Sequence, residues 1–177
     1  MRVIAGTLGG RQFKSPGGHR THPMSEKMRG AMFGVLGDIK GLTVLDAFAG
    51  SGALSFEAIS RGAKSAMMLD DDKPAALTIT ENITALGLQD RVRFIKANSY
   101  NWSRRYSKEK FDLLLTDPPY DKLPFPVIEG IVRNLAPGGT YVLSWPSQYE
   151  HPKLYGLKVI SNKVYGDAQL VFYQHIE

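Results

Sequence analysis

Between residues 42 and 145 the sequence alternates short apolar runs with segments of helical periodicity. The apolar runs predict five strands, at 42–48, 65–70, 91–97, 111–116 and 140–145. The intervening patterns predict four helices, at 52–63, about 74–86, 99–110 and 125–135. Strands joined through helices form right-handed crossovers, so their sheet is parallel and covered on both faces. The alternation therefore predicts an α/β fold.

The segments that flank this alternation predict β-hairpins. Residues 2–14 contain two short extended pieces, RVIAG and RQFKS, around TLGG. A helix over residues 25–39 follows, with Ser25 as its expected N-cap. Residues 157–176 hold two extended runs around YGD, which would add an antiparallel edge to the sheet. We therefore expect a mostly parallel sheet with an antiparallel C-terminal hairpin and a small N-terminal hairpin and helix extension.

The composition narrows the class of protein. The chain of 177 residues fits one domain with a substantial core, and no run approaches the roughly 20 apolar residues of a membrane helix. The start lacks the apolar stretch of a signal peptide, and the chain has no cysteine for a disulfide or a thiolate metal site. The four histidines, His19, His22, His151 and His175, show no metal-ligand spacing. We expect a cytoplasmic protein without a metal or a membrane partner.

The net charge of +5 lies entirely in residues 1–40, where seven basic side chains face two acids. Residues 41–177 balance 15 basic against 15 acidic groups. A basic appendage on a neutral body favours a polyanionic partner, above all a nucleic acid. A merely solvated basic face is the alternative.

The turn VLDAFAGSGA, residues 44–53, joins the first predicted strand to the following helix. Gly50 and Gly52 would let a ligand approach the backbone at the carboxyl edge of the sheet. A dinucleotide fingerprint needs glycine or alanine where Ser55 stands, and no P-loop lysine is present. Asp46 would repel a pyrophosphate but would suit a ligand with an amine as well as a carboxylate. S-adenosylmethionine (SAM) carries both groups.

Polar residues follow the second and third predicted strands at the same edge. Asp70 is placed to accept hydrogen bonds from ribose hydroxyls. Asp71 and Asp72 are expected in the next turn and at the helix N-cap, while Asn98 and Ser99 are candidates either for the adenine edge or for a helix cap. The cofactor-binding candidates are Asp46, Phe48, Ala49, Gly50, Ser51, Gly52, Asp70, Asp71, Asn98 and Ser99.

The tetrapeptide DPPY ends the fourth predicted strand with a rigid corner, because two prolines continue neither a helix nor a sheet ladder. The Asp117 carboxylate and the Pro118 carbonyl would accept hydrogen bonds from an exocyclic amine, and Pro119 donates none. Tyr120 can stack on a base. We interpret Asp117, Pro118, Pro119 and Tyr120 as the catalytic clamp of a methyl transfer, in which positioning supplies the catalysis. A surface turn is the alternative.

These residues, in this order, resemble the class I SAM-dependent methyltransferases and, more closely, the RsmD family of 16S rRNA guanine-N2 methyltransferases. The similarity covers essentially the whole chain through RVIAGTLGGRQF, HPMSEKMRGAMFGVL, VLDAFAGSGALSFEAISRGA, LDDDKPA, FDLLLTDPPY and VYGDAQLVFY. DPPY is widespread among amino-group methyltransferases, whereas the glycine turn with EAISRGA after that N-terminal block is more specific. The chain departs from the family at His22-Pro23-Met24, commonly Arg-Pro-Thr, and at Asp70, usually glutamate.

The resemblance implies a Rossmann-like seven-stranded sheet with SAM in its crevice, and a basic extension at 1–40 before a methyltransferase domain at 41–177. It implies one guanine of the assembling 30S subunit as substrate, and we expect a monomer. The RNA-binding candidates are Arg2, Arg11, Lys14, Arg20, His22, Lys27 and Arg29. Two alternatives stay open: a DNA adenine-N6 methyltransferase, for which the chain has no room for an inserted recognition domain, and a non-catalytic RNA-binding assembly factor.

Overall fold

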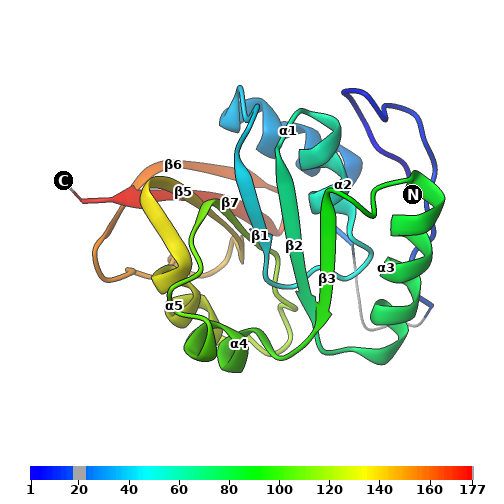
Figure 1. Ribbon diagram of the computed structural model, residues 1–177. Coiled ribbons are helices and arrows are strands. Elements are labelled where there is room, and N and C mark those ends of the chain that lie inside the picture. The colour runs from blue at the N-terminus through cyan, green and yellow to red at the C-terminus, as the bar shows by residue number, and fades with distance from the viewer. Residues whose placement is uncertain (18–22, 177) are drawn as a thin grey trace.

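The computed structural model describes residues 1–17 and 23–176 and contains one seven-stranded sheet with the order β3-β2-β1-β4-β5-β7-β6 (Figure 1). The strands are β1 (Thr43–Asp46), β2 (Ser65–Asp70), β3 (Val92–Lys96), β4 (Phe111–Thr116), β5 (Leu135–Pro146), β6 (Leu157–Tyr165) and β7 (Ala168–His175). Neighbouring strands from β3 to β5 pair in parallel, and β7 pairs antiparallel with β5 and with β6. The predicted α/β class, strand count and closing hairpin are confirmed.

The helices are α1 (Glu26–Leu36), α2 (Ala53–Ser60), α3 (Lys73–Leu86), α4 (Ser99–Arg105) and α5 (Phe125–Gly130), followed by the 3₁₀ helix η1 (Ile131–Asn134). The predicted N-caps are confirmed, because Ser25 Oγ accepts from Met28 N at 3.1 Å and Asp72 caps α3 through Ala75 N at 3.0 Å. In the described part of the chain no helix is both long and apolar enough to cross a membrane.

Helix α5 is shorter and strand β5 longer than the sequence pattern predicts. The helical pattern over 125–135 divides into α5 and η1, and the backbone is already extended at Leu135. Strand β5 pairs with β4 from Leu135 onward, and at Gly139 a Cβ would lie 2.8 Å from the Asp112 carbonyl oxygen of the neighbouring strand. Glycine therefore allows β5 to approach β4 closely at this point.

The predicted N-terminal hairpin is confirmed: Arg2 and Gln12 form an antiparallel bridge, and the amides of Val3, Gly10 and Phe13 donate across it to the carbonyls of Arg11, Val3 and Met1. The amides of Ile4 and Ala5 donate to the Glu57 carboxylate, and Thr7 N donates to the Ser60 carbonyl. These residues satisfy further backbone groups on α2, so the hairpin is held both by its own pairing and by α2.

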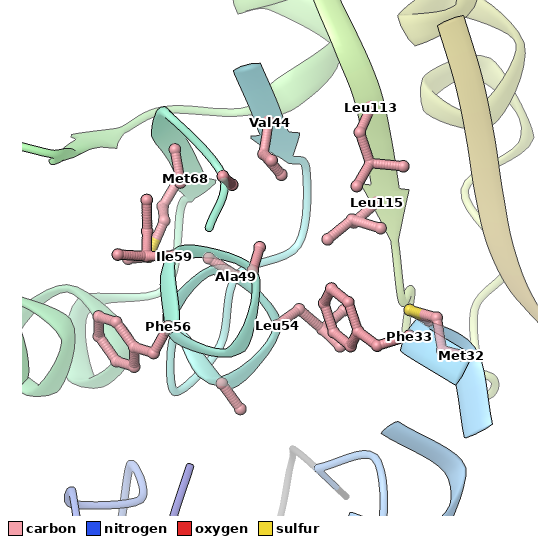
Figure 2. Close-up of a cluster of buried hydrophobic side chains, with 14 of the residues drawn as sticks. Met32, Phe33, Val44, Ala49, Leu54, Phe56, Ile59, Met68, Leu113 and Leu115 are labelled. Atoms are coloured by element: carbon pink, nitrogen blue, oxygen red, sulfur yellow. The ribbon is translucent and has the colours of Figure 1, made fainter. Parts of the chain in front are cut away.

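Two clusters of buried side chains lie on the two faces of the sheet. One cluster joins α1, α2 and α3 to β1, β2 and β4, and Figure 2 shows Phe33 of α1 beside Leu54 of α2, with Leu113 and Leu115 of β4 facing them. The other cluster packs Trp102 of α4 and η1 against the opposite face of the sheet. Helices α4 and α5 lie next to each other on that side (Figure 1).

The N-terminal segment, residues 1–14, packs on the first of these faces. Val3 and Phe13 are buried, and the Phe13 ring meets the Phe56 ring edge-on with centroids 5.3 Å apart. In Figure 1 the segment runs beside α2 and α3. The segment therefore shares the core of the sheet, and the division of the chain at residue 40 stays a prediction.

Candidate active site

The predicted site residues lie where the central parallel strands end. Asp46 is the last residue of β1 and pairs with Leu115 of β4, and Asp117 follows two residues later. Asp70 is the last residue of β2. The carboxyl ends of parallel strands share one edge, so these three carboxylates face the same region of the molecule.

The glycine turn adopts a conformation that other residues enter only with strain. Gly50 has φ +55° and Gly52 has φ +85°. A Cβ on Gly52 would lie 2.6 Å from the Phe56 ring, whereas a Cβ on Gly50 would meet nothing within 4 Å. Gly52 is therefore required by internal packing, and the backbone at Gly50 borders open space into which a ligand can come close.

Asp46 is fully buried beneath this turn. Its Oδ2 accepts a hydrogen bond from Ser55 Oγ at 2.9 Å, and its Oδ1 has no partner among the described residues. Burial is the main reason that the pKa of Asp46 is raised to about 7; the Ser55 hydrogen bond partly opposes this effect, and the neighbouring charges of Asp117 and Asp70 add to it. A buried carboxylate with one unpartnered oxygen suits a cationic group such as an amine.

Asp70 organises the other side of the turn. Its Oδ2 accepts from Gly50 N at 2.8 Å and its Oδ1 accepts from Asp72 N at 2.9 Å. Burial raises its pKa, and these two backbone hydrogen bonds oppose the rise. Each carboxylate oxygen retains a lone pair for a further donor, so the side chain can still receive ribose hydroxyls.

The remaining cofactor candidates lie around the same turn. Ala49 and Ser51 are buried within it, and Phe48 packs on the face that carries α4. Ser99 Oγ donates to the Ala47 carbonyl at 2.5 Å, which fastens α4 to the turn. Asn98 caps α4 through Tyr100 N and Asn101 N, and its amide lies 3.4 Å from Asp71 Oδ2. The expected helix cap is confirmed, and contact with an adenine stays a prediction.

The DPPY corner follows β4 at this edge. Asp117 is partly buried, Pro118 is buried and Pro119 is exposed. Burial raises the pKa of Asp117 to about 6, and the Ser144 hydroxyl partly opposes the rise. The Tyr120 hydroxyl lies 2.5 Å from Ser144 Oγ, and burial raises the pKa of Tyr120 to about 12. The corner thus offers acceptors beside an aromatic ring whose hydroxyl is anchored to β5.

Three polar residues that position this site were not among the predicted site residues. Ser55 holds Asp46, and Ser144 holds Tyr120. Asn82 of α3 is 1% exposed, and its amide nitrogen donates to the carbonyl oxygens of Ser51, at 3.2 Å, and Lys14, at 2.9 Å. Asn82 could have been found, because a polar amide on the apolar face of a predicted helix needs a partner.

The basic candidates of the N-terminal region differ in exposure. Lys27 is exposed, and Arg2 and Lys14 are exposed in ion pairs with Glu26 and Glu81.

Arg11 is exposed and donates to the carbonyls of Ala85 and Leu86 at the end of α3. Arg20 and His22 lie outside the described residues.

The expectation that Arg29 contacts RNA is wrong for this conformation. Its side chain is 0% exposed and donates to the Arg2 carbonyl at 2.6 Å. Its Nε lies 3.6 Å from Glu57 Oε2, which supplies the opposite charge that a buried guanidinium needs. The motif that suggests a nucleic-acid contact therefore serves the attachment of the N-terminal segment.

The strand order, the strained glycine turn and the acids at the ends of β1 and β2 define a class I methyltransferase fold. The family described as Conserved hypothetical protein 95 matches residues 1–174 of this chain. The protein therefore belongs to that family, which is the RsmD family of methyltransferases.

Three known proteins illustrate the relationship. The chain is 34% identical over 119 residues to ribosomal RNA small subunit methyltransferase D of Buchnera aphidicola. The matched region covers 67% of this chain and 62% of that protein. It is 29% identical over 181 residues to the putative rRNA methyltransferase YlbH of Bacillus subtilis, which covers 98% of each. The structure of a putative methyltransferase, yhhF, from Escherichia coli superposes with a TM-score of 0.86 at 24% identity, covering 99% of this chain and 97% of that one, and shows the shared fold.

Proposed function

We propose that this protein transfers a methyl group from SAM to the exocyclic N2 amine of a guanine in 16S rRNA of the assembling 30S subunit. One observation carries the proposal: the acceptor corner at Asp117 and the buried acid Asp46 lie on adjacent strands, close enough for the charge of one to affect the pKa of the other. The amine acceptors and the proposed methyl-donor site therefore lie at the same edge of the sheet. Relatives named as rRNA methyltransferases support the choice of RNA.

The residues of the glycine turn fit SAM. The unpartnered Oδ1 of Asp46 would accept a hydrogen bond from the amine of the methionine moiety. The backbone at Gly50 would lie against the ligand, and Asp70 would accept hydrogen bonds from the ribose hydroxyls. The bound cofactor supplies an electrophilic methyl group on a positively charged sulfur. The three acids Asp46, Asp70 and Asp117 at this edge of the sheet favour that positive charge over a dinucleotide phosphate.

The DPPY corner holds the base. Asp117 and the Pro118 carbonyl would accept the two N–H groups of the amine, which directs its nitrogen lone pair toward the methyl carbon. The Tyr120 ring would stack on the base, a contact that contributes about 1–3 kcal/mol in other base-binding proteins. Positioning of this kind supplies most of the expected rate enhancement.

The second oxygen of the Asp117 carboxylate would accept the ring N–H of guanine, a contact that adenine lacks, although the DPPY motif alone does not select between the two bases. Guanine carries its amine beside a ring N–H, so it presents two adjacent donors, whereas adenine carries its amine beside an unprotonated ring nitrogen. A carboxylate only accepts, so it matches the guanine edge. After transfer the nitrogen bears a positive charge and loses one proton, which Asp117 or water accepts.

The exposed cations Arg2, Arg11, Lys14 and Lys27, together with Arg20 and His22, would meet the RNA backbone. The target guanine must be accessible or flipped out of its stack to reach the corner. A monomer working in the cytoplasm on a partly assembled particle fits this arrangement, because the particle itself presents the shape that the protein reads.

The deciding experiment is a labelled-methyl assay on 30S particles from cells that lack their own enzyme, with naked rRNA and DNA as parallel substrates. We expect N2-methylguanosine from the particles. N6-methyladenosine from the DNA would establish the adenine methyltransferase alternative. SAM binding measured by calorimetry tests the non-catalytic alternative, because a folded protein that does not bind SAM is no methyltransferase.

A further inference from the structure

Asn82 of α3 connects the N-terminal segment to the glycine turn. Its side chain is 1% exposed, and its Oδ1 accepts a hydrogen bond from Lys14 N at 2.9 Å. Its Nδ2 donates to the Lys14 carbonyl at 2.9 Å and to the Ser51 carbonyl at 3.2 Å. An amide side chain has two N–H donors and one oxygen, so both donors and the oxygen of Asn82 are engaged. The residue therefore ties the backbone of residue 14 to the middle of the turn.

A second contact joins the same two parts of the molecule through aromatic rings. The buried rings of Phe13 and Phe56 meet edge-on with centroids 5.3 Å apart. The Phe56 ring in turn lies against Gly52, where a Cβ would come within 2.6 Å of it. Residues 13 and 14 thus contact the two groups that support Ser51 and Gly52, one through a side chain and one through the backbone.

The turn depends on such supports because its backbone belongs to neither a helix nor a strand. Gly50 and Gly52 have positive φ, and Gly50 N donates to Asp70 Oδ2 at 2.8 Å. The Ser51 carbonyl accepts from Asn82 in a buried hydrogen bond. A buried carbonyl without a partner is unfavourable, so loss of this bond would favour other conformations of the turn.

We propose that Asn82 is a positioning residue that makes the conformation of the glycine turn depend on the docking of the N-terminal segment. The inference rests on the proposed function for its consequence, which is that docking of the segment and binding of SAM favour each other. SAM needs the turn in one conformation, since the backbone at Gly50 would lie against the ligand. By linkage, SAM strengthens the docking of the segment by the factor by which docking strengthens SAM binding.

The segment is also attached at the end of α2 that lies away from the turn. Thr7 N donates to the carbonyl of Ser60, the last residue of α2, at 2.8 Å. Gly6 lies against the same carbonyl, and a Cβ at Gly6 would overlap its oxygen. Gly6→Ala therefore loosens the segment without altering Asn82 or any residue of the turn.

The test measures amide hydrogen exchange by NMR in the SAM-free protein. Asn82→Ala should speed exchange about tenfold or more at the Gly52 N–H, which is hydrogen-bonded within the turn. Gly6→Ala should speed it as well, although Asn82 is intact. Glu81→Ala is the matched control, because Glu81 precedes Asn82 and holds Lys14 only through an exposed ion pair. We expect this control to leave Gly52 exchange within about threefold of wild type.

The same variants test the consequence for SAM. We expect SAM to slow exchange of the Lys14 N–H in the wild type, although Lys14 is not among the proposed SAM contacts, and to lose this effect in Asn82→Ala. By calorimetry, SAM affinity should fall about tenfold in Asn82→Ala and should stay at the wild-type value in Glu81→Ala. A role of Asn82 in stability alone would lower the free energy of unfolding without linking SAM to Lys14.

Unchanged Gly52 exchange in Asn82→Ala would overturn the inference, and so would fast Lys14 exchange with unchanged Gly52 exchange in Gly6→Ala. If Asn82→Ala fails to fold, Gly6→Ala decides. The exchange measurement needs no cofactor. A protein whose Gly52 exchange depends on the segment but that binds no SAM would therefore refute the proposed function and leave the role of Asn82 standing. SAM binding without that dependence would do the reverse.

Discussion

Arg29 of α1 and Glu57 of α2 form a fully buried ion pair, with Nε and Oε2 3.6 Å apart. Glu57 also accepts from the backbone amides of Ile4 and Ala5 and from Arg61 Nε at 2.8 Å. Burial lowers the pKa of Arg29, and the charge of Glu57 opposes that effect. One carboxylate therefore holds the N-terminal segment, α1 and α2 together.

Removing this carboxylate should be strongly destabilising. We expect Glu57→Ala to lower the free energy of unfolding by about 3–5 kcal/mol, because it leaves the Arg29 charge and two amides without an acceptor. Urea denaturation measures the change. Glu26→Ala is the matched control, because its ion pair with Arg2 is exposed and should contribute at most about 1 kcal/mol. Equal effects of the two substitutions would contradict the structural role assigned to the buried pair.

Gly6→Ala should detach the N-terminal segment from α2. A Cβ at Gly6 would lie 1.9 Å from the Ser60 carbonyl oxygen, and the residue has φ +82°. We expect the free energy of unfolding to fall by about 2 kcal/mol or more, and the backbone amides of Ile4 and Ala5 to exchange hydrogen with solvent faster. Gly10→Ala is the control, because Gly10 has the same φ and a Cβ there meets nothing within 4 Å. Equal amide exchange rates at Ile4 and Ala5 in the Gly6→Ala and Gly10→Ala variants would contradict the prediction.

Asp46→Asn should stabilise the protein at neutral and alkaline pH. The folded protein binds the Asp46 proton with a pKa of about 7, against 3.8 for an unperturbed aspartate, so the wild type loses stability as pH rises through that window. Asparagine carries no such charge. The stability difference between variant and wild type should therefore grow by about 2–4 kcal/mol from pH 4 to pH 8. A pH-independent difference, measured by urea denaturation, would show that Asp46 titrates normally.

Asp117→Ala should abolish methyl transfer while SAM affinity stays within about threefold of wild type, since the residue is proposed to hold the base rather than the cofactor. We expect a fall in rate of about a thousandfold or more. Single-turnover assays and calorimetry separate the two effects. Asp121→Ala, at an exposed acid four residues further on, is the control. A parallel loss of SAM affinity would assign Asp117 to the cofactor site.

Lys27→Glu should weaken RNA binding because Lys27 is an exposed cation of the N-terminal region. The slope of log affinity against log salt should become shallower by about 0.7–1. Lys108→Glu is the control, since Lys108 is exposed and follows α4 on the opposite face of the sheet. Identical slopes in the two variants would refute an RNA contact at Lys27.

Local sequence patterns correctly predicted the secondary-structure elements of the parallel part of the sheet. The bounds of β2 and β4 agree with their apolar runs, and Asp46, Asp70 and Asp117 could be placed at one edge because parallel strands end together. The same reasoning predicted the hairpin of residues 2–14 correctly, but it could not foresee the further acceptors on α2, about fifty residues away.

Side-chain pairing was the part that sequence could not supply. The contacts of Ser144 with Tyr120 and of Asn82 with Ser51 depend on which strands and helices become neighbours. The burial of Arg29 was missed for the same reason, because a basic residue in a basic segment gives no sign that a buried acid will pair with it. The net charge of a segment does not indicate which of its charged side chains are buried.

The attachment of the N-terminal segment reverses the usual order in which a chain folds as it is synthesised. Ile4 and Lys14 are made before their partners Glu57 and Asn82, which follow 53 and 68 residues later. Domains generally fold from the N-terminus as they emerge, and long-range contacts form slowly. Residues 1–14 therefore cannot complete their contacts with the core until α3 has left the ribosome.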